Sequence, residues 1–152
     1  MEDATFEMYD DFVEAFSAMM ESVHKNAVNK GFWEPPKELQ ELQEILLHKA
    51  TIMHPAAEER ALQLIADMAT RNDGEAIALM HSELSEMLEA QRKMQGQQSE
   101  KIPEFTHEEE EAADLLIRLM DFCAGKGLRL AEAVVAKAAY NKGRPYKHGK
   151  KF

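Results

Sequence analysis

The spacing of apolar residues constrains the fold of this chain more than any other feature. Over long stretches apolar residues recur every three or four positions, as in Phe16, Met20 and Val23. This spacing places their side chains on one face of an α-helix, whereas a half-buried strand alternates apolar and polar residues. Only five Pro and seven Gly among 152 residues interrupt the pattern. The sequence therefore predicts an all-α protein.

Turn-forming residues predict where the helices begin and end. The first helix is expected to stop near Gly31, with Pro35 and Pro36 behind it. Two shorter helices, broken at Pro55, are expected within residues 37–71. The remaining helices are expected over residues 74–94, after Thr106 as far as Gly125, and over residues 130–142.

Polar residues mark the beginnings of two of these helices. Asp73 follows a turn-forming stretch and is expected to cap the helix after it. Thr106, with Glu109 three residues later, matches a capping box, in which each residue accepts a hydrogen bond from the backbone of the other. The polar stretch over residues 96–105 is expected to be the loop between these two helices.

The length fits one domain, since domains commonly contain about 100 to 200 residues. We expect a single domain over residues 1–152, built as a four-helix-type bundle. The helices within residues 37–71 would be an inserted helical hairpin, and residues 143–152 a basic C-terminal tail. Residues 137–152 hold six basic residues and no carboxylate, although the whole chain has a formal net charge of −10.

The charge and the cysteine content exclude several classes of function. A net charge of −10 disfavours partners that are themselves anionic, so neither nucleic acid nor a membrane surface is expected. Cys123 is the single cysteine, which rules out an internal disulfide and a zinc-thiolate site. No targeting segment and no membrane-spanning run of apolar residues is recognised. These features favour a cytoplasmic protein.

Two pairs of carboxylates carry the clearest chemical signal. Glu83 and Glu86 lie one helical turn apart, and Glu111 and Asp114 repeat that spacing on the next predicted helix. Helices joined by a loop of about ten residues commonly pack as antiparallel neighbours, so the four carboxylates are expected to converge. Other acids are expected to be solvated surface residues, namely Glu89, Glu108, Glu109 and Glu110.

Four converging carboxylates repel one another unless a cation neutralises them. Oxygen ligands without thiolate suit Mg²⁺, or alternatively Mn²⁺. Because Mg²⁺ keeps several waters and bridges to phosphate oxygens, the expected substrate is a polyphosphate.

The arrangement Glu83-x-x-Glu86, 24 intervening residues and Glu111-x-x-Asp114 resembles the signature of the MazG-like all-α nucleoside triphosphate pyrophosphohydrolases, which are related to dimeric dUTPases and dCTP pyrophosphatases. Residues 137–149, from Lys137 to Gly149, resemble the ending of the MazG-like members. The resemblance covers residues 20–34 and 72–152. The stretch 37–71 is longer than the connection expected in compact members.

The resemblance implies a function and roles for individual residues. In that family four carboxylates bind Mg²⁺, a metal-bound water attacks the α-phosphorus, and pyrophosphate leaves a nucleoside monophosphate. Glu83, Glu86, Glu111 and Asp114 would take these catalytic and metal-binding roles. Further residues are expected to bind the substrate: Lys137, Asn141 and Arg144 at the β- and γ-phosphates, Trp33 near the base, and Tyr146 and Lys147 in the ending.

The amount of apolar surface, together with the resemblance, predicts a homodimer or a homotetramer. Two other interpretations stay open. The helices could form a non-enzymatic interaction module in which the carboxylates are only a solvated surface. Glu21-x-x-His24 and Glu104-x-x-His107 imitate the paired motifs of di-iron carboxylate bundles, although the second pair straddles the cap expected at Thr106.

Overall fold

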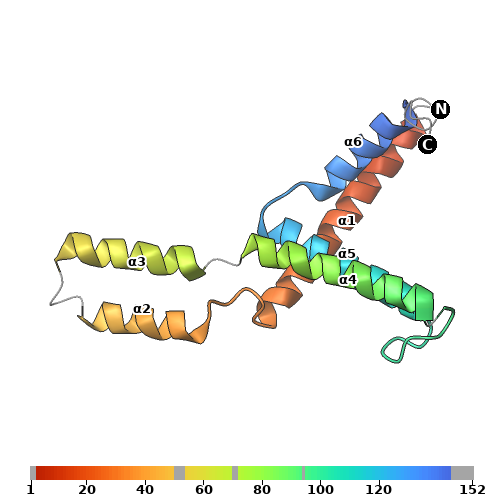
Figure 1. The fold of residues 1–152 in the computed structure, drawn as a ribbon. Helices are drawn as coiled ribbons and strands as arrows, with labels where there is room; N and C mark the ends of the chain where they lie inside the picture. The colour runs from red at the N-terminus through yellow and green to blue at the C-terminus, as the bar shows by residue number, and fades with distance from the viewer. Residues whose placement is uncertain (1–2, 50–53, 70–71, 94, 145–152) are drawn as a thin grey trace. The chain divides into compact units, whose positions relative to one another are not determined.

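The computed structural model describes residues 3–49, 54–69, 72–93 and 95–144. Within them every regular element is a helix, so the prediction of an all-α protein is confirmed (Figure 1). Strand-like pairing in the described part of the chain is limited to one isolated bridge between Gln98 and Thr106. In chain order the helices are α1 (Asp3–Asn29), α2 (Lys37–Lys49), α3 (Pro55–Ala69), α4 (Asp73–Lys93), α5 (His107–Gly125) and α6 (Leu130–Lys142).

The first helix ends where the sequence indicated. Gly31 has a φ of 81°, in the left-handed region that glycine adopts without a steric penalty. Its backbone N–H donates to the carbonyl of Val28 at 3.0 Å, which satisfies one of the carbonyls that a helix leaves open at its C-terminal end.

The cap expected at Asp73 is wrong by one residue. The side-chain oxygen of Asn72 accepts hydrogen bonds from the backbone N–H groups of Gly74 at 2.9 Å and Glu75 at 3.3 Å. Asp73 is instead the first residue of α4, where its negative charge still favours the helix N-terminus. Asn and Asp cap helices about equally well, so the sequence alone did not separate the two neighbours.

The capping box at the start of α5 is confirmed. Thr106 accepts from the backbone N–H of Glu109 at 3.3 Å, and the Glu109 carboxylate accepts from the backbone N–H of Thr106 at 2.7 Å. The backbone N–H of Thr106, and then its hydroxyl, donate to the Glu109 carboxylate and hold the Glu109 pKa below its ordinary value. These hydrogen bonds also fix the residue at which the loop after α4 turns into α5.

The chain divides into two compact units, residues 27–79 and residues 1–26 together with 80–152. The stretch 37–71, expected to be an inserted hairpin, lies inside the first of these units. There α2 packs against α3, and Ile65 of α3 is buried. Trp33 lies half-buried in the connection between α1 and α2.

The unit formed by residues 1–26 and 80–152 has its core between α1 and α5. Met20, Met120 and Cys123 are buried there. A hydrogen bond between α1 and α5 lies beside this core and joins Nδ1 of His24 to Oδ1 of the buried Asp121 at 2.8 Å. Partly buried apolar residues complete the core: Phe16, Val23, Leu119, Phe122, Ala124 and Leu130.

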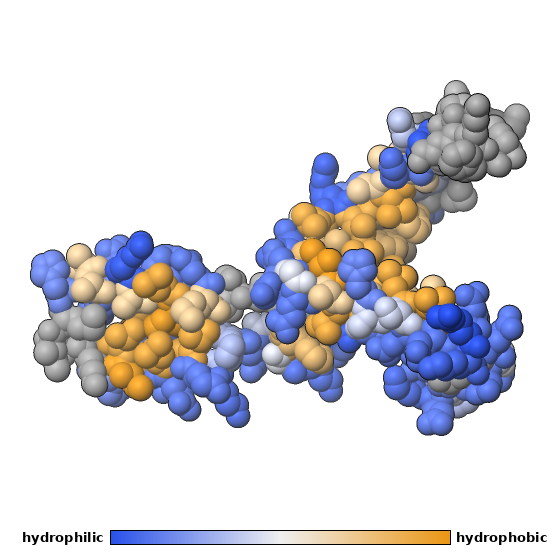
Figure 2. Space-filling model, viewed as in Figure 1, coloured by the Kyte–Doolittle hydropathy of each residue, from blue (hydrophilic) through white to orange (hydrophobic). Residues whose placement is uncertain are grey.

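Large apolar side chains also remain at the surface of this unit. On α6 only Ala131 is buried, and Val134 and Tyr140 are exposed. Figure 2 shows apolar side chains on the visible face of the region occupied by α4, α5 and α6. Among the described residues, no helix combines the length and the apolar composition needed to cross a membrane.

Candidate metal centre

Helices α4 and α5 bring three of the four predicted carboxylates together. Glu83 and Glu86 lie one turn apart on α4, and Glu111 lies on α5. One carboxylate oxygen from each of these three residues lies within 4.8 Å of the other two. Among the described residues, these three side chains form the group whose ligand atoms are close enough to share a metal ion.

The three carboxylates, which we call the acidic triad, differ in their access to solvent. Glu83 is buried with 5% of its surface exposed, Glu111 is half-buried, and Glu86 is exposed. A cation held by the triad would therefore have protein on its Glu83 side and solvent on its Glu86 side. Such an arrangement leaves room for water or a substrate oxygen beside the protein ligands.

Asp114, the fourth predicted ligand, lies one turn after Glu111 on α5 and is half-buried. Asp114 lies outside the triad, but its negative charge interacts with Glu111. Burial is the first cause of a Glu111 pKa raised above its ordinary value. The negative charges of neighbouring carboxylates raise this pKa further, in decreasing order Glu86, Glu110, Glu83 and Asp114.

Arg118 is a neighbour of the triad that the sequence analysis missed. Its Nε donates to Oε1 of Glu83 at 2.6 Å, and 38% of the Arg118 side chain is exposed. The signal was present in the sequence, since Arg118 follows Asp114 by four residues and Glu111 by seven. These spacings place all three residues on one face of α5.

The loop before α5 contributes a second ion pair that the sequence did not indicate. Lys101 Nζ lies 2.6 Å from Oε1 of Glu110, which is buried. The hydrogen bond from Lys101, followed by one from Ser99, lowers the Glu110 pKa. The expectation that Glu110 is a solvated surface acid is therefore wrong, because the loop folds over the start of α5 and covers this carboxylate.

The same loop is organised around Ser99, which is buried. Its hydroxyl oxygen accepts from the backbone N–H groups of Lys101 and Ile102, both at 3.0 Å. Its own N–H donates to the carbonyl of Phe105 at 2.8 Å. Glu108 is half-buried, whereas the expectations of surface positions for Glu109 and Glu89 are confirmed.

The predicted phosphate-binding residues on α6 lie at the surface. Lys137, Asn141 and Arg144 are exposed at intervals of four and three residues. The cationic groups of Lys137 and Arg144 both lie near the Tyr140 ring, with Lys137 Nζ 4.7 Å and Arg144 Cζ 5.9 Å from its centre. Trp33 belongs to the unit of residues 27–79, and Tyr146 and Lys147 lie outside the described residues.

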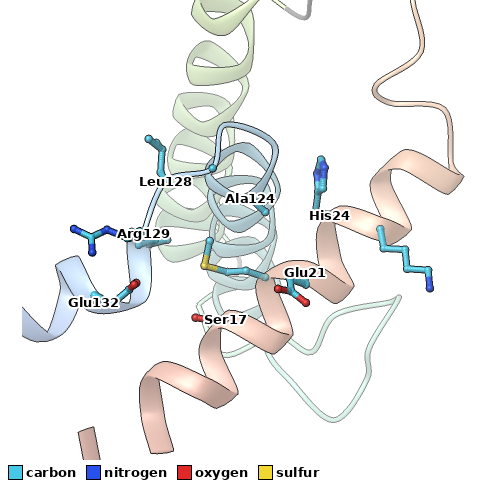
Figure 3. Close-up of a pocket in the computed structure, with 11 residues that line it drawn as sticks. Ser17, Glu21, His24, Ala124, Leu128, Arg129 and Glu132 are labelled. Atoms are coloured by element: carbon cyan, nitrogen blue, oxygen red, sulfur yellow. The ribbon is translucent and has the colours of Figure 1, made fainter. Parts of the chain in front are cut away.

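A cavity of about 340 Å³ opens between α1 and the connection from α5 to α6 (Figure 3). Its wall combines basic and acidic groups with apolar surface, a mixture that the sequence analysis did not anticipate. The polar residues that line it are Ser17, Glu21, His24, Lys25, Arg129 and Glu132.

The motifs that imitate a di-iron bundle do not form matching helical pairs. Glu21 and His24 both lie on α1, and His24 pairs with Asp121. Glu104 lies in the loop before α5, and His107 is the first residue of that helix. The capping box at Thr106 therefore separates Glu104 from His107, as the sequence indicated.

Comparisons of the chain with protein-family models, with curated proteins and with solved structures found no match.

Proposed function

We propose that the protein is a Mg²⁺-dependent nucleoside triphosphate pyrophosphohydrolase, which converts its substrate to the nucleoside monophosphate and pyrophosphate. The observation that carries this proposal is the acidic triad, in which Glu83, Glu86 and Glu111 converge from two helices. The resemblance of the four carboxylates to the MazG-like signature supports the choice of reaction.

The chemistry of the triad fits a small divalent cation. All three groups offer carboxylate oxygens, the ligands that Mg²⁺ and Mn²⁺ prefer. Burial of Glu83 and the raised pKa of Glu111 both indicate that the charged triad is costly without a counter-charge. A bound Mg²⁺ supplies charge stabilisation at phosphoryl oxygens and makes water a better nucleophile at neutral pH.

The residues of the chain would divide the work. Glu83, Glu86 and Glu111 would hold the cation, and the charge of Asp114 would add to the negative potential around it. Lys137, Asn141 and Arg144 offer hydrogen-bond donors from α6, suited to the β- and γ-phosphates. The resemblance also assigns substrate binding to Trp33, Tyr146 and Lys147.

We further propose a homodimer or a homotetramer. Exposed apolar side chains on α4 and α5 support this assembly, because burying them against another copy removes apolar surface from water. These side chains are Leu84, Leu88, Leu116 and Ile117. Light scattering at micromolar concentration should give the mass of two or four chains, and a monomer would contradict this part of the proposal.

Pyrophosphate release from a panel of nucleoside triphosphates tests the proposed reaction. We expect turnover with Mg²⁺, a preference for deoxynucleotides with broad tolerance of the base, and no turnover in chelator. Glu83→Gln should lower turnover by several orders of magnitude. Glu89→Gln, an exposed position on the same helix, should keep it and is the matched control.

Two outcomes would count against this function. A wild-type chain that releases no pyrophosphate from any nucleotide in the panel would favour the non-enzymatic interaction module. Full turnover in Glu83→Gln would show that the acidic triad is not the reaction centre.

A further inference from the structure

Arg118 makes the one ion pair with the acidic triad that the described structure shows. Its Nε lies 2.6 Å from Oε1 of Glu83, the most buried of the three carboxylates. The contact joins α5 to α4, so the same two helices supply both the triad and its counter-charge.

Glu83 needs this counter-charge for two reasons. Burial removes water from its carboxylate, and the oxygens of Glu86 and Glu111 lie within 4.8 Å. Desolvation and nearby like charges both make a buried negative charge costly. A guanidinium is suited to offset them, because it stays protonated at all ordinary pH values and tolerates partial burial.

The same contact places Arg118 in competition with a divalent cation. A cation bound by the triad would use the Glu83 carboxylate that Arg118 now contacts, and its two positive charges would repel the guanidinium. We propose that Arg118 is the internal counter-ion of the acidic triad and that a divalent cation displaces Arg118 from Glu83. Because Arg118 competes for this carboxylate, it lowers the affinity of the triad for the cation.

This role rests on the proposed function insofar as the cation is the cofactor of that reaction. Arg118 is here a positioning residue that acts through Glu83. A merely structural ion pair makes the opposite prediction, since loss of the arginine would then disorder Glu83 and weaken cation binding.

Calorimetric titration of the full chain with MgCl₂, repeated with MnCl₂, separates the two roles. Removing the positive charge that competes for Glu83 should tighten binding by at least about tenfold, so we expect this gain in Arg118→Gln. Arg118→Lys keeps the charge and should stay within about twofold of wild type. Arg92→Gln removes an exposed arginine of α4 and is the matched control, with unchanged affinity.

A second measurement uses the wild-type chain and does not depend on how the variants fold. The Nε–Hε resonance of Arg118, assigned by its absence in Arg118→Lys, reports the hydrogen bond to Glu83. We expect this resonance to shift progressively as Mg²⁺ is added and to stop shifting at saturation of the calorimetric site.

The outcomes distinguish this proposal from the proposed function. If the wild type binds Mg²⁺ but Arg118→Gln binds it equally or more weakly, the counter-ion role is overturned and the metal-dependent function stands. An Arg118 resonance that does not move at saturating Mg²⁺ also overturns it. If neither the wild type nor Arg118→Gln binds a divalent cation, both proposals fail.

Discussion

Replacing Glu83 by Gln should separate the stability of the fold from its response to Mg²⁺. The substitution exchanges a buried carboxylate for an amide of nearly the same size, so it opens no cavity. It removes one negative charge from the acidic triad and one partner from Arg118. The stability of the metal-free protein therefore depends on which of these two electrostatic changes is larger.

The distances in the structure set the size of each change. At an effective dielectric constant of about 20, unit charges about 4 Å apart interact by about 4 kcal/mol, which approximates the attraction between Glu83 and Arg118. At the 4.8 Å limit of the triad each repulsion amounts to about 3.5 kcal/mol. Solvent screens the repulsion from exposed Glu86, and the raised pKa of Glu111 weakens the second repulsion. The sum of the two repulsions is therefore similar in size to the attraction between Glu83 and Arg118. We expect Glu83→Gln to change the free energy of unfolding without cation by no more than about 1 kcal/mol.

The response to Mg²⁺ should differ much more. A cation that binds only the folded chain stabilises it by about 2.7 kcal/mol at a concentration 100 times its Kd. Loss of a direct ligand should weaken binding by about a hundredfold or more, since even outer-shell partners commonly contribute 10- to 100-fold. At the same Mg²⁺ concentration Glu83→Gln should then gain only about 0.4 kcal/mol.

Urea unfolding followed by circular dichroism, with and without MgCl₂, measures both quantities. Glu89→Gln is the control, because Glu89 is exposed on the same helix and pairs only at the surface with Lys93 at 3.0 Å. This control should lose at most about 0.5 kcal/mol and keep the full gain from Mg²⁺. The reasoning is refuted if Glu83→Gln also keeps that gain, or if the wild type shows none.

Four further predictions follow from individual contacts. Thr106→Ala should lower the free energy of unfolding by about 1 kcal/mol, measured in urea, whereas Thr106→Ser should retain the cap. The lowered pKa of Glu110 contributes stability that is present above the ordinary carboxyl pKa and is lost as the pH falls through the folded-state pKa. Lys101→Ala should therefore reduce the loss of stability between pH 7 and pH 3. An unchanged pH profile of the free energy of unfolding would contradict this role of Lys101. Burial raises the pKa of the Cys123 thiol, so a thiol reagent should label it at least about tenfold more slowly in the native protein than in urea, and equal rates would argue against the described core. Arg144→Ala should raise the KM for a triphosphate while calorimetry shows unchanged Mg²⁺ affinity; loss of Mg²⁺ binding would assign this arginine to the metal site instead.

The sequence by itself determined the helices, because their causes are local. Apolar spacing, the glycine at position 31 and the capping box at Thr106 act within a few residues of one another, and each is found where it was expected. The cap of α4, expected at Asp73 and found at Asn72, is an error that also has a local cause. Two adjacent residues with nearly equal capping ability differ only in the backbone geometry that the chain adopts.

The sequence also indicated that carboxylates on two helices would converge, because their spacing and the short loop limit how those helices can pack. Only the tertiary structure decided which ones meet. It places Glu111 with Glu83 and Glu86, and it gives Glu83 the partner Arg118. Burial and ion pairing depend on contacts between residues far apart in the chain, such as Arg118 and Glu83. The spacing of residues along one helix therefore does not reveal which carboxylate is buried or which basic residue neutralises it.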